Sequence, residues 1–199
     1  MNAFFRHFGL VNRHRFQVWR NGCRCGIGFH CLFHDLSKYG PKEFWPSVRY
    51  FAGDHSPVLE QRKNEEYFST ICQHHTRRNK HHWEYWTDFY MGRIIAKTMP
   101  YVYATEYVCD MLAASYCYDP KGFSGQKTLD YYMARNGHYF MSDATREYVT
   151  WCLTRFAELG FAGLKKADTK KAYAEICSRH SDVRIYGTSS QEGALPPLR

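Results

Sequence analysis

Apolar side chains recur along most of the chain at the three- to four-residue spacing of amphipathic helices. The first segment, residues 4–19, carries this spacing at Phe5, Phe8, Val11, Phe16 and Trp19. We find no convincing alternation of apolar and polar residues of the kind that marks a half-buried strand. The pattern therefore predicts an all-α protein.

Glycine and proline residues divide the chain into the predicted helices. Gly40-Pro41 ends a helix over 25–38 and begins a short helix that runs to residue 51, and Pro57 precedes a helix over 58–77. The other predicted helices cover residues 82–97, 101–118, 127–135, 143–160 and 166–179. Together they predict one bundle of about seven to nine helices over residues 1–186, followed by a flexible tail over 187–199.

The composition is that of one folded domain, because 44% of the 199 residues are hydrophobic. No apolar run reaches the roughly 18 residues that a membrane span requires, and Arg6, His7 and Arg13 interrupt the N-terminal segment. The eight cysteines include no Cys-x-x-Cys pair, which favours a reduced chain over a disulfide scaffold or a cysteine zinc site. We therefore expect a cytoplasmic protein with no membrane partner.

The chain carries 27 Lys and Arg against 19 Asp and Glu, a formal charge of +8. An excess of this size suggests an anionic partner, and nucleic acid is one alternative. However, the aromatic run at 82–86 is interleaved with acidic Glu84 and followed by Asp88, and the surplus lysines are spread along the chain. The charge is better explained as an environment that attracts a small phosphate-bearing substrate.

Histidine is the more informative residue, since four of the 11 histidines fall within nine positions, at His74, His75, His81 and His82. Two further histidines, His14 and His34, lie on separate predicted helices, and His34 is followed directly by Asp35. A later carboxylate, Asp110, lies in the most apolar predicted helix. Each has a structural alternative. His14 could be a core histidine with its hydrogen bonds satisfied, and the His34-Asp35 pair could occur by chance. Asp110 could form an ion pair with an arginine. The ordered set of nitrogen and oxygen donors instead favours one or two divalent transition metals: Mn, Fe, Co, Ni or Zn.

This order of residues resembles the HD-domain superfamily of helical metal-dependent phosphohydrolases. More closely, the chain is similar to an uncharacterised family of small HD-like proteins of bacteria and phages. The matching stretches span about half the chain: residues 12–15 with Val18, HDLSKYGPKEF (34–44), HHTRRNKHHWEYW (74–86) and MPYVYATEYVCDMLAAS (99–115). The histidine-rich stretch is highly specific, whereas a His-Asp pair alone is not.

The resemblance implies a first metal held by His14, His34, Asp35 and Asp110. Extra histidines mark the dinuclear members of the superfamily, and here we expect His75 and His82 to hold a second ion. We prefer this pair to His74 and His81 because, in a continuous helix, His75, Asn79 and His82 would lie on one face at positions i, i+4 and i+7. The extra histidines are more crowded in this sequence than in most dinuclear members.

The function that follows is a metal-dependent phosphohydrolase acting on a nucleotide or another small phosphate ester. We expect Asp35, Lys38 and Glu43 to be catalytic and Lys38, Arg78 and Asn79 to bind the substrate. Lys38 matches the lysine of the superfamily's His-Asp-x-x-Lys motif, although a solvated lysine at a helix C-terminus is a simple alternative. Glu43 is a candidate general acid or base, or else a first-turn helix carboxylate. The functional alternatives are an HD-type di-iron oxygenase and a basic nucleic-acid-binding helical protein.

Overall fold

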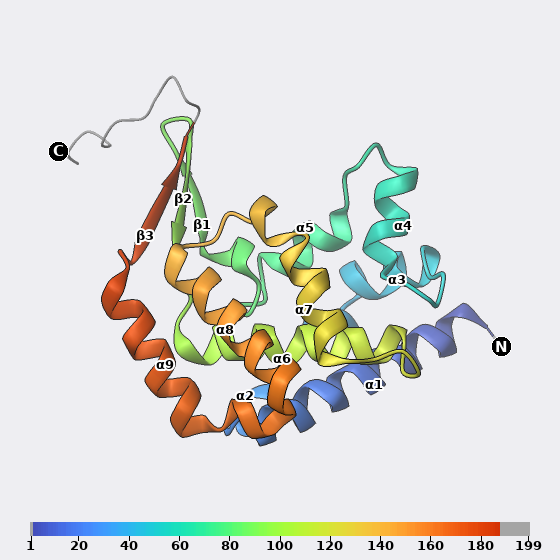
Figure 1. Ribbon diagram of the computed structural model, residues 1–199. Coiled ribbons are helices and arrows are strands. Elements are labelled where there is room, and N and C mark those ends of the chain that lie inside the picture. Colours follow the sequence, from blue (N-terminus) through green and yellow to red (C-terminus); the bar gives the residue numbers. More distant parts are fainter. Residues whose placement is uncertain (1, 188–199) are drawn as a thin grey trace.

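The computed structural model describes residues 2–187, which form a largely helical domain with a small sheet at one end (Figure 1). The predicted tail falls outside these residues from position 188 onward. The α-helices are α1 (Ala3–Arg24), α2 (Gly28–Cys31), α3 (Pro41–Arg49), α4 (Pro57–Asn64), α5 (Thr70–Thr76), α6 (Tyr101–Tyr118), α7 (Gly125–Met133), α8 (Asp143–Leu159) and α9 (Lys166–Arg179). Short 3-10 helices are η1 (Leu36–Tyr39), η2 (Trp83–Trp86), η3 (Asn136–His138) and η4 (Gly160–Leu164).

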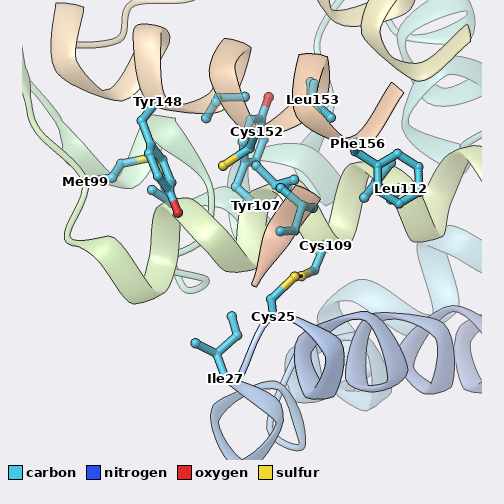
Figure 2. Packing of buried hydrophobic residues seen from close by; sticks show 14 of the residues in the cluster. Cys25, Ile27, Met99, Tyr107, Cys109, Leu112, Tyr148, Cys152, Leu153 and Phe156 are labelled. Carbon is cyan, nitrogen blue, oxygen red and sulfur yellow. Dashed lines mark hydrogen bonds between the residues drawn. The ribbon is translucent and has the colours of Figure 1, made fainter. Parts of the chain in front are cut away.

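Helix α6 is the centre of the fold, with α1 packed along it on one side and α8 on the other (Figure 1). Its apolar residues are buried around most of its circumference, as expected of a helix enclosed by neighbours. Figure 2 shows Tyr107, Cys109 and Leu112 of α6 beneath Tyr148 and Leu153 of α8. None of the helices in the described part of the chain is long and apolar enough to cross a membrane.

The prediction of a purely all-α protein was wrong, because strands β1 (Thr87–Tyr90), β2 (Arg93–Lys97) and β3 (Val183–Tyr186) form an antiparallel sheet in the order β1-β2-β3. The first two strands replace most of the helix predicted over 82–97. Met91 and Gly92 have φ values of 49° and 75°, as a two-residue hairpin turn requires. Strand β1 is largely exposed, so it carries no alternation of buried and exposed residues.

The long helices were predicted well, and α6 has the predicted bounds. Ser142 caps the N-terminus of α8, because its side chain accepts a hydrogen bond from the backbone nitrogen of Thr145. The predicted helices over 25–38 and 58–77 were wrong, since each is divided. In the first, α2 ends at Cys31 and a turn leads to Asp35, whose φ is 52°; in the second, α4 ends at Asn64, shortly before Glu66 and Tyr67, with φ of 45° and 69°. These left-handed residues prevent a continuous helix, and no glycine or proline stands at either break.

His7 of α1 is a buried histidine that makes stability depend on pH. It packs against the rings of Phe44 and Phe51, and its Nδ1 has no hydrogen-bond partner in the described part of the chain. Burial, together with the charge of Lys38, lowers its pKa to about 4. The unfolded chain therefore takes up this proton near pH 6.5 and the folded chain only near pH 4.

Below pH 6.5 the proton on His7 stabilises the unfolded state, so the free energy of unfolding should fall between pH 6.5 and pH 4 by an amount on the order of 1–3 kcal/mol. His7→Gln should remove this contribution and give a shallower acid dependence in denaturant titrations over that range. His138→Gln is the matched control, because His138 is exposed. Equal pH slopes for wild type and His7→Gln would contradict the prediction.

Candidate metal centre

Asp35 lies at the centre of a cluster of histidines drawn from several helices. The turn that follows α2 holds it in a left-handed conformation and buries it to 1% exposure. Among the described residues neither of its oxygens has a partner with hydrogen-bond geometry, although Lys38 Nζ is 2.6 Å from Oδ2. Oδ1 faces imidazole nitrogens at 3.3 and 3.4 Å, and a buried carboxylate oxygen without a hydrogen-bond partner among the described residues is suited to a cation.

The first group of candidate ligands is His14, His34, Asp35 and Asp110, whose ligand atoms lie within 4.8 Å of one another. His14 Nε2 is 2.9 Å from Asp110 Oδ1 and 3.3 Å from His34 Nε2. His34 Nε2 is in turn 3.1 Å from Asp35 Oδ2. The packing of α1 against α6 brings His14 and Asp110 together. These are the four residues predicted for the first metal.

The second group is Asp35, His75, His81 and His82, again within 4.8 Å. His75 Nε2 and His81 Nε2 are 3.3 Å and 3.4 Å from Asp35 Oδ1, the oxygen that does not face the first group. His82 lies beside them, and its buried Nε2 has no partner among the described residues. Burial and the neighbouring His81 hold the pKa of His82 well below its usual range. A neutral imidazole is the form that binds a metal.

The helical argument for His75, Asn79 and His82 was wrong, because α5 ends at Thr76. Beyond it the backbone turns, and this turn lets both His81 and His82 approach Asp35. His81 was therefore missed by assuming a continuous helix, although the crowding of histidines was the signal for it. His74, the other histidine set aside, lies next to Glu43 rather than Asp35.

Glu43 lies beside the second group and is buried to 1% exposure. Its Oε2 is 2.9 Å from Nδ1 of His75, and its Oε1 is 2.8 Å from Nδ1 of His74. Asn79 Nδ2 donates to Ser37 Oγ and to the backbone oxygen of His75, both at 2.9 Å. These contacts fit a role for Glu43 and Asn79 in orienting His75.

Glu106 is a residue that sequence reasoning did not assign to the site. It lies on α6 one turn before Asp110, is 4% exposed, and has Oε1 at 2.9 Å from His34 Nδ1. Its Oε2 is 2.7 Å from His30 Nε2. The i, i+4 spacing to Asp110 in an apolar helix was the available signal.

Two predicted substrate-binding residues have different surroundings. The Lys38 side chain is 31% exposed and lies against Asp35 at the edge of the cluster. Arg78 is exposed and lines a surface cavity of about 390 Å³ with Gln73, His74 and Arg77. Of these two predicted substrate-binding side chains, Lys38 is the one that lies next to the candidate ligands.

The donor set fits a metal. The first group offers two imidazoles and two carboxylates, and the second offers three imidazoles and the same Asp35. Mixed imidazole and carboxylate ligands suit Zn, Fe, Ni, Co and Mn. Four buried atoms that accept or donate no hydrogen bond among residues 2–187 lie in these same groups: Asp35 Oδ1, Asp35 Oδ2, His81 Nε2 and His82 Nε2.

Comparison with known proteins identifies a family without assigning a reaction. No curated protein and no solved structure matches the chain significantly. A family model described as a family of unknown function (DUF5662) matches residues 3–155, a range that contains every member of both ligand groups. The chain belongs to the DUF5662 family.

Proposed function

We propose that this protein is a metal-dependent phosphohydrolase of the HD type that acts on a nucleotide or another small phosphate ester. The observation that carries the proposal is the position of Asp35, whose Oδ2 faces the first group and whose Oδ1 faces the second. A carboxylate with one oxygen toward each of two ligand groups is suited to bridging two ions. The order of His14, His34-Asp35 and Asp110 along the chain, which resembles HD proteins, adds support.

Bound metal ions would supply Lewis acidity toward a phosphoryl oxygen and would activate a water molecule for attack. The protein's own residues hold the centre and receive the substrate. Lys38 could neutralise a phosphate oxygen, because its side chain is partly exposed and its ammonium group lies 2.6 Å from Asp35 Oδ2. The formal charge of +8 attracts anions toward the site over a longer range.

The proposal is tested by elemental analysis of purified protein, combined with phosphate release from a panel of nucleotides and phosphate esters. We expect two equivalents of a transition metal and phosphate release that a chelator abolishes. Metal-loaded protein that releases no phosphate from any ester would contradict the hydrolase. Iron-loaded protein that consumes O₂ instead would favour the di-iron oxygenase. Salt-dependent retention of nucleic acid that survives loss of the ligands would favour the nucleic-acid-binding alternative.

Lys38→Met should lower kcat/KM by about 10- to 100-fold while leaving the bound metal in place, because the lysine would contact substrate rather than metal. The measurement is phosphate release alongside metal content. Lys97→Met is the matched control, since the Lys97 side chain is 61% exposed on β2. Loss of metal from Lys38→Met, or unchanged kinetics, would contradict this role.

A further inference from the structure

Two imidazole rings lie side by side between two buried carboxylates. The rings of His34 and His81 have centroids 4.4 Å apart and are inclined by 37°. On one side, their Nδ1 atoms lie 2.9 Å and 3.4 Å from the same oxygen, Glu106 Oε1. On the other side, their Nε2 atoms lie 3.1 Å and 3.4 Å from the two different oxygens of Asp35. One histidine thus belongs to each ligand group, and Glu106 is next to both.

An ion on the Asp35 side would select one tautomer in both rings. Asp35 and Glu106 are both acceptors, but a bound ion would take the Nε2 lone pairs, so that each Nδ1 carries the hydrogen and faces Glu106 Oε1, to which His34 Nδ1 donates at 2.9 Å and from which His81 Nδ1 lies 3.4 Å away. A carboxylate behind a histidine ligand fixes the orientation of the ring and raises its basicity. Glu106 is therefore placed behind one histidine ligand of each group, on the side away from Asp35.

Glu106 is itself held firmly. It projects from α6, the buried central helix, and its second oxygen Oε2 is 2.7 Å from His30 Nε2 on α2. Glu43 differs from Glu106 in that it contacts a ligand of only one group. That ligand is His75, which belongs to the second group alone.

We propose that Glu106 is a positioning residue that orients one histidine ligand of each group through a single oxygen and thereby makes binding of the two metal ions interdependent. The inference rests on the metal centre of the proposed function. An ion that fixes His34 also fixes the Glu106 oxygen against which His81 is oriented, so the second ion meets a site that is already ordered. The two groups also share Asp35 as a candidate ligand.

The test is titration of the metal-free full-length chain with Co²⁺, followed by calorimetry and by the visible absorption of the bound ion. Wild type should bind two equivalents with positive cooperativity. Glu106→Gln keeps the size of the side chain but removes its negative charge and leaves one acceptor oxygen for the His34, His81 and His30 rings together. It should weaken binding at both positions by about 10- to 100-fold and abolish the cooperativity. The Co²⁺ spectrum should change as well, which general destabilisation alone would not produce.

Two matched variants separate positioning from a general effect of removing a carboxylate. Glu43→Gln should weaken the intrinsic affinity of the second position alone and should keep the cooperativity. Glu147→Gln should change neither, because Glu147 pairs with His180 and Arg179 away from the ligand groups. If Glu106→Gln does not fold, Glu106→Asp keeps the charge at a shorter reach and should show the same two-position weakening to a smaller degree.

Several outcomes would overturn the inference: wild-type affinity at both positions in Glu106→Gln, weakening at one position only, or independent binding in wild type. A third equivalent of Co²⁺, lost in Glu106→Gln, would also overturn it, since His34, His81 and Glu106 are themselves close enough to hold an ion. Wild type that binds two ions interdependently but releases no phosphate would overturn the proposed function alone. Wild type that releases phosphate but binds its ions independently would overturn this inference alone.

Discussion

Asp35→Asn should lose both metal ions, with affinity at each position lowered by more than about 100-fold, the upper end of the range for loss of an outer partner. Among the described residues, Asp35 is the one side chain common to the first and second groups. Asparagine keeps the shape but replaces one oxygen with an amide nitrogen that cannot bind a cation, and it removes the negative charge. Phosphate release should fall with the metal content, which elemental analysis measures after dialysis.

A second variant distinguishes a ligand shared by both ions from a ligand of one ion only. Asp110→Asn should remove one ion and leave the other bound, weakened only by loss of the coupling between the two positions, because Asp110 belongs to the first group alone. Asp88→Asn serves as the control, since Asp88 is an exposed aspartate on β1. Retention of one tightly bound ion by Asp35→Asn would show that the carboxylate does not serve both groups.

The part of the site that could be predicted is the part carried by long, regular helices and by one distinctive dipeptide. His14 and Asp110 lie on α1 and α6, whose apolar periodicity is strong, and these helices pack directly together. His34 and Asp35 were found through their adjacency, although the helix predicted around them is broken at Asp35 itself. Residue type and order therefore identified the first group even where the local structure was predicted incorrectly.

The part that could not be predicted depends on where the chain turns. The helix predicted over 58–77 ends within one residue of α5, but the choice of His75 with His82 extended its spacing past Asn79, and the turn beyond Thr76 decides which histidines reach Asp35. Glu106 was not assigned to the site, because a carboxylate in an apolar helix does not reveal its partners, which here come from α2, from the turn after it and from residue 81. Such partnerships are long-range contacts that no local pattern encodes.

The sheet was missed for a related reason. Strand β2 pairs with β3, so that Ile95 lies opposite Ile185, about 90 positions further along the chain. Strand β1 is largely exposed on the other side of β2. A strand stabilised by such a distant partner has little signature in its own sequence, because strand propensity reflects its neighbours more than its backbone.

Tyr148→Ala should have the largest effect on the fold itself, lowering the free energy of unfolding by about 3–5 kcal/mol, as expected for truncation of a buried aromatic side chain. Tyr148 is 0% exposed on α8, its ring packs against Tyr173, and its hydroxyl is 2.8 Å from Thr105 Oγ1 on α6. Denaturant unfolding measures the loss, and Tyr131→Ala, at a residue 55% exposed, should change stability by no more than about 0.5 kcal/mol. Because Thr105 precedes Glu106, metal affinity measured in the folded Tyr148→Ala protein shows whether this contact also supports the site. A loss below 1 kcal/mol would mean that α8 repacks against α6 without the ring.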